Sequence, residues 1–352
     1  MKRLFVVMMA VLFVAGYSSA VMAFHDAGVA YCGGCHTMHN SQGGVLVDAD
    51  HPTGNAYLLK KGSPSDTCLA CHASYGQLTT DGLSLGPGGD FYWAKTDVSY
   101  VGGGGTSVTI FGREHGHNLN APGNGLSADT VLTTAPGGTY ISDQLGCNSC
   151  HDPHGNVNFR LLYGIESETA ANYPGDYAFA EPAPTATGNS RRTKIADAGA
   201  EKHAQHTAYI SGMSDWCANC HANFHSGMTS NIVHPTDQGL GSDHAGNYNA
   251  YVTTGVLTGD VSTSYLGLVP FEDAANTTTS TTGPTAASKV MCLTCHRAHA
   301  SPYPDAGRWD FRATELSASH PAGEPYLAEW SGGNPLDLTA QRSLCNKCHI
   351  QD

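Results

Sequence analysis

The chain begins with one long apolar stretch. Residues 1–23 combine a basic start at Lys2 and Arg3, a continuous apolar run and small residues up to Ala23. This pattern is typical of a secretory signal peptide, so we predict cleavage after Ala23 and a mature protein of residues 24–352. No later apolar run is long enough for a membrane span, and we therefore expect no transmembrane segment in the mature chain.

After the leader, hydrophobic and polar positions show little sustained periodicity. Few segments alternate as a half-buried strand would, and helical patterns are short, lying near six cysteine motifs and at 191–209. The connecting segments are rich in Gly, Thr, Ser, Pro and Asn, as at 81–90 and 276–288. Such long irregular stretches usually indicate disorder unless a bound group orders them. We expect one continuous unit of irregular loops and short helices, with little or no sheet, around a chain of haems.

Composition and charge narrow the class of protein. Only 13% of the residues are charged, against about 25% in ordinary globular domains, and 42 of the 352 are glycine. Without Lys2 and Arg3, 15 basic residues face 30 acidic ones, a formal charge of −15. Nucleic acid is not expected as a partner, because binding it requires a basic surface.

All twelve cysteines belong to six copies of C-x-x-C-H, the signature of covalent c-type haem attachment. The two thiols bond the porphyrin and the adjacent histidine binds the iron. A redox dithiol or half of a zinc site also uses C-x-x-C, but neither explains a histidine after every pair. We predict six haem c groups. The six sites, in chain order, are Cys32/Cys35/His36, Cys68/Cys71/His72, Cys147/Cys150/His151, Cys217/Cys220/His221, Cys292/Cys295/His296 and Cys345/Cys348/His349.

The number of histidines favours two imidazoles on every iron. The chain has 19, of which six belong to the motifs, whereas only four methionines follow Ala23. A six-coordinate iron with two protein ligands has no open position for a substrate, and no CxxCK variant of the kind found in multihaem nitrite reductases is present. We therefore predict electron transfer and no catalytic residues, with low reduction potentials.

A second histidine follows four of the motifs closely. So short a segment cannot pass around its own porphyrin, so this histidine binds a different iron or none. Surface or hydrogen-bonding histidines are the alternative interpretation. The four followers are His39, His154, His225 and His299. The second and sixth sites lack a follower, and their expected donors are His25, His117 and His234. Weaker candidates are His51, His115, His203, His206, His244 and His320.

Several motifs together resemble one family. They are "FHDAGVAYCGGCHTMHNSQGG", "TTAPGGTY", "GCNSCHDPHG", "GMSDWCANCH", "CLTCHRAHAS" and "LCNKCH". These motifs and their order resemble those of the OmcS-like hexahaem c-type cytochromes of the outer surface of metal-reducing bacteria, although the spacers of this chain are shorter. The resemblance runs from the mature start to the last residues and is patchy in the spacers. It implies polymeric filaments with an unbroken haem row, in which His39 binds the iron of the fifth site in a neighbouring subunit.

We therefore expect an exported protein that carries electrons outside the cell as a filament subunit. The expected partners are further copies of the chain, redox proteins of the periplasm or outer membrane, and extracellular acceptors such as metal oxides. The expected location is the outer surface or the extracellular space, with the periplasm as the alternative. Two other functions stay open: a soluble monomeric electron carrier, and a multihaem terminal reductase.

Overall fold

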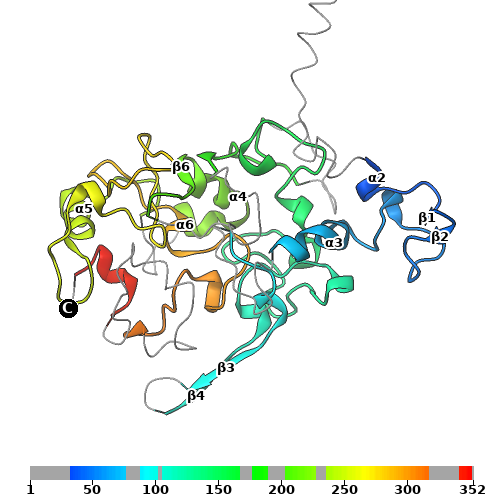
Figure 1. The fold of residues 1–352 in the computed structure, drawn as a ribbon, viewed down its shortest axis with the longest axis horizontal. Helices are drawn as coiled ribbons and strands as arrows, with labels where there is room; N and C mark the ends of the chain where they lie inside the picture. Colours follow the sequence, from blue (N-terminus) through cyan, green and yellow to red (C-terminus); the bar gives the residue numbers. More distant parts are fainter. Residues whose placement is uncertain are drawn as a thin grey trace, which may run out of the picture.

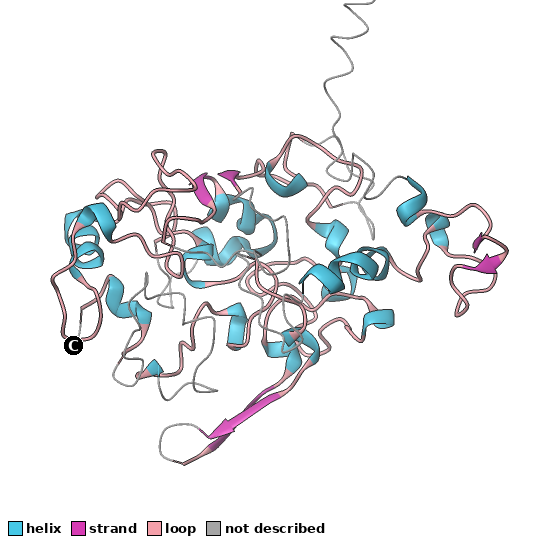
Figure 2. Ribbon diagram, viewed as in Figure 1, coloured by secondary structure: helices cyan, strands magenta, loops and turns pink. Residues whose placement is uncertain are grey.

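Short helices and long irregular loops make up most of this computed structural model (Figures 1 and 2). The structure describes residues 32–76, 88–101, 105–166, 177–188, 203–226, 235–316 and 341–350. The α-helices are α2 (Cys32–Cys35), α3 (Pro64–Gly76), α4 (Met213–Ser226), α5 (Gly241–Ala250) and α6 (Cys292–Cys295). None of the described helices is both long and apolar enough to cross a membrane. The predicted class of loops, short helices and little sheet is confirmed.

The strands of the described residues form three separate antiparallel pairs. They are β1 (Ser41–Gln42) with β2 (Val45–Leu46), β3 (Val98–Val101) with β4 (Ser107–Ile110), and β5 (Thr185–Thr187) with β6 (Ala208–Ser211). Gly43 and Gly44 join β1 to β2, and both have positive φ angles, which a two-residue hairpin turn favours. The β3–β4 pair projects away from the body of the molecule (Figure 1).

Every attachment motif lies on a helical turn. Residues at i and i+3 share one face of such a turn, so both cysteines of a motif point to the same side. The first, second, fourth and fifth motifs lie on α2, α3, α4 and α6, and the third and sixth on the 3₁₀-helices η6 and η13. The described 3₁₀-helices are η1 (Ala56–Leu58), η2 (Trp93–Lys95), η3 (Gly112–Glu114), η4 (Pro122–Asn124), η5 (Ser142–Gln144), η6 (Cys147–Ser149), η7 (Phe159–Leu161), η9 (Val261–Thr263), η10 (Pro304–Ala306) and η13 (Leu344–Lys347).

Helix α3 shows how local sequence sets such a turn. It begins at Pro64, whose missing N–H and fixed φ suit a first helical position. The Ser63 hydroxyl accepts a hydrogen bond from the Asp66 backbone N–H at 3.0 Å and donates to the Asp66 carboxylate at 2.8 Å. This cap satisfies one of the free N–H groups of the first turn. The helix start is therefore fixed four residues before Cys68, the first cysteine of the second site.

Within the described residues, aliphatic and aromatic side chains form three small clusters instead of one large core. The largest contains Tyr248, Tyr251, Leu268, Phe271 and Trp309 near α5 and η13. The second packs around α3, and the third around α4 and α6. The lobe with α2, β1 and β2 and the region with α5 lie at opposite ends of the molecule (Figure 1). Motif cysteines pack against every cluster, Cys295 and Cys348 against the first, Cys147 against the second and Cys217 against the third.

Candidate haem-binding sites

The six cysteine pairs lie beside one another in chain order. All twelve cysteines are free thiols, as covalent attachment to a porphyrin requires. Burial and then the neighbouring Cys71 thiol raise the pKa of Cys35, which places the first and second sites together. The thiols of Cys68 and Cys147 share a hydrogen bond, and α3 packs against η6, which joins the second site to the third.

The same order continues along the rest of the chain. The neighbouring thiols are Cys150 with Cys220, Cys217 with Cys292, and Cys295 with Cys345. Burial is the main cause that raises the pKa of Cys150 and Cys295 to about 12. Helix α4, which carries the fourth motif, packs against α6, which carries the fifth. The attachment sites therefore form one row from the first to the sixth, with no site left apart from its neighbours.

Three pairs of histidine rings face each other across a distance that fits one metal ion. The ring centroids are 6.3 Å apart for His36 and His154, 6.3 Å for His151 and His299, and 6.0 Å for His117 and His221. A histidine nitrogen binds a metal at about 2 Å, so two imidazoles on opposite sides of one iron have centroids roughly 6 Å apart. The residues present thus fit haem iron with two axial imidazoles.

Hydrogen bonds at Nδ1 fix the tautomer of these imidazoles. A metal-binding histidine commonly donates its other N–H to a carbonyl, which orients the ring and makes the ligand more basic. The same arrangement recurs at four motif histidines and at one candidate partner, each with Nδ1 donating to a backbone carbonyl. The pairs are His36 with Tyr57 at 2.9 Å, His151 with Arg160 at 2.8 Å, His221 with Pro136 at 2.8 Å, His296 with Asp305 at 2.7 Å, and His117 with Ala298 at 2.7 Å.

Burial keeps several of these rings neutral. It is the main cause that lowers the pKa of His117, His151 and His296 below the ordinary value of 6.5, and it lowers that of His299 to about 3. Only a neutral imidazole has a nitrogen lone pair for a metal. These four side chains are therefore in the ligand-competent state at neutral pH.

A buried hydrogen-bond donor, the indole N–H of Trp93, also indicates that a bound group lies near the third site. Trp93 Nε1 is buried and has no hydrogen-bond partner in the described part of the chain. Buried N–H groups are nearly always satisfied in folded proteins, so a group absent from the polypeptide is expected to accept this bond. The propionates of a haem are acceptors of the required kind. Phe91, two residues earlier, stacks on the ring of His299 at 4.6 Å, so this segment adjoins the third site.

The other predicted donors have different surroundings. His117 was expected to serve the second or sixth site, but it faces His221 of the fourth, because its segment pairs with residues 299 and 300. His244, a weaker candidate, faces His349 of the sixth site at 5.1 Å. Both ring nitrogens of His225 are already hydrogen-bonded, Nε2 to Asp215 at 2.7 Å and Nδ1 to Thr236 at 2.8 Å. The geometry therefore does not favour His225 as a ligand.

The remaining weaker candidates contact residues outside the attachment motifs. His203 Nδ1 donates to the Tyr265 carbonyl, His206 stacks on Tyr265, and His115 is buried near Trp93. His51 bonds to Asp48. His25, His234 and His320 lie outside the described residues, and so does the predicted signal peptide.

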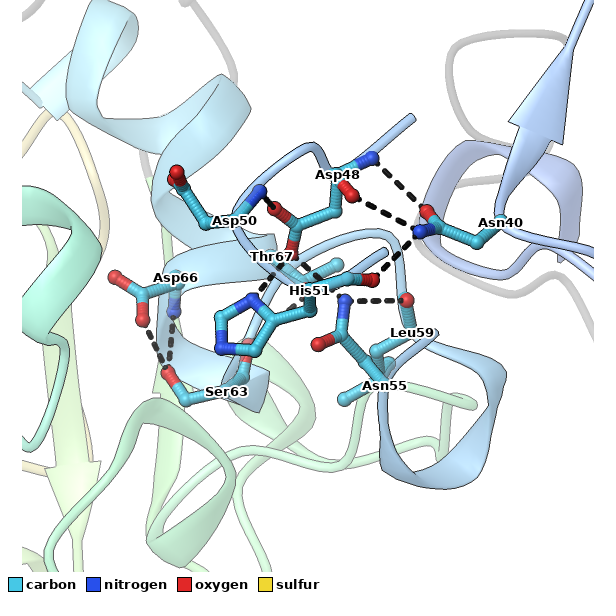
Figure 3. A network of polar contacts seen from close by, with 9 residues as sticks. All are labelled: Asn40, Asp48, Asp50, His51, Asn55, Leu59, Ser63, Asp66 and Thr67. Atoms are coloured by element: carbon cyan, nitrogen blue, oxygen red, sulfur yellow. Dashed lines mark hydrogen bonds and ion pairs between the residues drawn. The ribbon is translucent and has the colours of Figure 1, made fainter. Parts of the chain in front are cut away.

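His39 is exposed, and the residue after it, Asn40, belongs to a polar network that holds the loop (Figure 3). Among the described residues His39 has no hydrogen bond, ion pair or ring contact. The next residue, Asn40, is buried with a φ angle of 46°, and its side chain bonds to the backbone of Asp48 and His51. The Asp48 carboxylate in turn accepts from Asn55 at 2.8 Å and pairs with His51 at 2.9 Å. The network holds the loop while the His39 ring stays free for an outside contact.

Comparison with known proteins identifies clear relatives. No family model matches the sequence. It is 35% identical over 421 aligned positions to the C-type cytochrome OmcS of Geobacter sulfurreducens, and the alignment covers 95% of each chain. The fold is similar to two solved structures from that organism, the outer membrane cytochrome S filament and the OmcS nanowires seen by cryo-electron microscopy. Each has a TM-score of 0.74 and 32% identity, covering 94% of this chain and 100% of the other.

Proposed function

We propose that this chain, which belongs to the OmcS family of c-type cytochromes, transfers electrons outside the cell through six haem c groups as the subunit of a filament. The observation that carries the proposal is the single spatial row of six attachment sites. When bound, each haem supplies a one-electron redox centre. The chain holds these centres close together, as electron transfer along a row requires.

The histidine pairs give a set of proposed axial ligands. The motif histidines, His36, His72, His151, His221, His296 and His349, bind the iron of their own site. His154, His299 and His117 complete the first, third and fourth sites, since they face His36, His151 and His221 at about 6 Å. His244 completes the sixth. His25 and His234 stay predictions for the second site, and His225 is left out because both of its nitrogens are hydrogen-bonded.

The order in which the follower histidines face the sites supports an iron for His39. The first, third and fifth sites each have the form C-x-x-C-H-x-x-H. The follower of the fifth site, His299, faces the third site, and the follower of the third, His154, faces the first. The follower of the first site is His39, and its own chain contains no earlier site. In a polymer, His39 would bind the iron of the fifth site of the next subunit. Within one subunit, no imidazole of the described residues faces His296, the motif histidine of that site.

Two further features support assembly through this lobe. The loop with His39 lies at one end of the molecule (Figure 1), where a second copy can reach it. Large apolar side chains are exposed on the same lobe, among them Met38, Val45, Leu46, Tyr57 and Leu58. Several exposed large apolar side chains on one small lobe are consistent with a protein interface. The lobe thus combines an available imidazole with the apolar surface that an interface needs.

The ligand set argues against catalysis. With two imidazoles on each iron, no position is open for a substrate, and no redox chemistry beyond electron transfer is needed. We place the protein at the outer surface or in the extracellular space. Redox proteins of the periplasm or outer membrane supply its electrons, and extracellular acceptors such as metal oxides receive them.

Imaging of the secreted, haem-loaded protein tests the proposal. Mass spectrometry should find six covalent haems, electron microscopy should show filaments, and the optical spectrum should be low-spin. His39→Ala should abolish filaments and make one haem in six high-spin. Discrete particles at every concentration would instead indicate a monomeric carrier. A ligand-accessible high-spin haem in the unchanged protein would indicate a reductase.

A further inference from the structure

Three of the six sites share an unusual backbone turn. In each, two successive residues other than glycine have left-handed φ angles: 57° and 58° at Tyr57–Leu58, 55° and 59° at Arg160–Leu161, and 58° and 53° at Asp305–Ala306. These six make up most of the eight such residues in the described part of the chain. We call the three pairs the left-handed turns; they end the short segments η1, η7 and η10, whose backbone is non-helical at Tyr57, Arg160 and Asp305. They accompany the first, third and fifth sites, which are the sites with the C-x-x-C-H-x-x-H form.

Each left-handed turn closes on its motif through the same three hydrogen bonds. The carbonyl of its first residue accepts from Nδ1 of the motif histidine, at 2.9, 2.8 and 2.7 Å. The carbonyl of its second residue accepts from the amide after that histidine, at 2.7, 2.8 and 2.6 Å. A backbone N–H two residues beyond the turn donates to the carbonyl of the second motif cysteine, at 2.9, 3.0 and 2.7 Å. The match holds although the turn follows the histidine by 21 residues at the first site and by nine at the third and fifth.

Side-chain burial differs among the three turns, since Leu161 and Ala306 are buried whereas Tyr57 and Leu58 are exposed, so packing is not what the turns share. The first residues Tyr57 (67% exposed) and Asp305 lie at the surface, so packing does not force Tyr57 and Asp305 into the left-handed region. Left-handed backbone is unfavourable for residues other than glycine and persists where surrounding contacts impose it, often at functional sites. The contacts that recur at all three turns are the hydrogen bonds to the motif.

We propose that the three left-handed turns are positioning elements for the motif histidines of the first, third and fifth haem sites. The inference rests on the proposed function, since it assigns these histidines to iron. Each turn aims a carbonyl at Nδ1, which leaves Nε2 for the metal and fixes the plane of the ring. A hydrogen bond at Nδ1 also makes the imidazole more basic. A more basic ligand stabilises ferric iron, so each turn lowers the reduction potential of its haem.

Substitutions at Asp305 separate backbone geometry from side-chain chemistry. Asn tolerates the left-handed region and Val does not, because it is β-branched, and both remove the charge. In the full-length, haem-loaded protein, Asp305→Val should raise the potential of one haem in six and change its electron paramagnetic resonance signal. Asp305→Asn should leave the potential and the signal as they are. Tyr57→Val and Tyr57→Asn should repeat the contrast at the first site, where no charge is involved.

Two measurements separate failure of this inference from failure of the proposed function. Mass spectrometry of each variant counts covalent haems, and redox titration with electron paramagnetic resonance reports the potential and signal of each haem. Six haems with identical potentials and signals in the Val and Asn variants of both positions would overturn the positioning role and leave electron transfer intact. Equal shifts of the reduction potential in the Val and Asn variants would also overturn the positioning role, because the effect would then come from loss of the original side chain and not from the backbone conformation. If the unchanged protein lacked the six haems, the proposed function itself would be wrong.

Discussion

The imidazole rings of His36 and His154 face each other with centroids 6.3 Å apart and planes only 16° from parallel. His36 belongs to the first attachment motif, and His154 follows the third. The contact joins the N-terminal lobe to the body of the molecule. In the proposed ligand set, the two imidazoles would hold the first haem iron, so that a histidine just after one motif completes a different site.

Replacement of His154 should change one iron alone. We expect His154→Ala to make one haem in six high-spin, because the opposite face of His36's iron loses its imidazole. His154→Met should keep that haem low-spin and raise its potential, since a thioether ligand favours the ferrous state. Optical and magnetic circular dichroism spectra of the haem-loaded protein measure both effects. A wholly low-spin spectrum in His154→Ala would contradict the pairing.

The network beside His39 should set the stability of the first lobe. We expect Asn40→Ala to destabilise the loop by about 2 kcal/mol or more, because buried backbone groups of Asp48 and His51 lose their partners. Hydrogen exchange in residues 40–55 should accelerate and filaments should become shorter.

Gln42→Ala is the matched control for Asn40→Ala, since it removes an amide from an exposed side chain of the same lobe. Its effect on stability should stay within about 0.5 kcal/mol. If both variants exchanged hydrogen equally fast, the network would have no special role in holding the loop.

Asp90 should make stability depend on pH. Burial raises its pKa to about 6 from the ordinary value of 3.8, against smaller opposing effects of the Tyr92 N–H and Lys95. Between these values the folded protein binds a proton that the unfolded chain has released. The free energy of unfolding therefore falls by about 3 kcal/mol as the pH rises from about 4 to about 6.

Urea denaturation of Asp90→Asn tests this titration. The amide keeps the acceptor for the Tyr92 N–H, which bonds to Asp90 at 2.8 Å, but it cannot ionise. We expect the variant to gain stability relative to the unchanged protein at pH 7 and to gain little at pH 4. An equal difference at both pH values would show that Asp90 does not carry the dependence.

Lys347 should raise the reduction potential of the sixth haem. It lies within the sixth motif, is buried, donates from Nζ to the Tyr251 carbonyl at 2.6 Å, and lies over the Tyr248 ring at 4.5 Å. A buried positive charge next to a haem favours the reduced iron. Lys347→Met should therefore lower one of six midpoint potentials by an amount on the order of tens of millivolts.

Lys95→Met provides the comparison for Lys347→Met. It makes the same charge change on an exposed side chain, where solvent and salt screen the interaction. Redox titration should therefore show a much smaller shift for Lys95→Met. Equal shifts in the two variants would mean that burial of Lys347 has no effect on the haem.

Local chemistry could be predicted from the sequence, and long-range pairing could not. The six C-x-x-C-H motifs and their helical turns depend on residues within five positions, and the glycine-rich spacers indicated irregular loops. His117 was expected at the second or sixth site and lies opposite His221, because its segment pairs with residues 299 and 300. His244 had no local signal that separated it from other histidines, yet it faces His349.

The sequence by itself determined how many haems the chain binds and predicted which side chains attach them, because thioether bonds and the adjacent ligand need only a short motif. It also determined that the interior could not be built from aliphatic side chains alone. The tertiary structure decided which histidine faces which site, since that depends on where distant segments cross. It alone revealed the left-handed turns, because their conformation is imposed by hydrogen bonds to the motifs and runs against the local preference of Tyr57, Arg160 and Asp305.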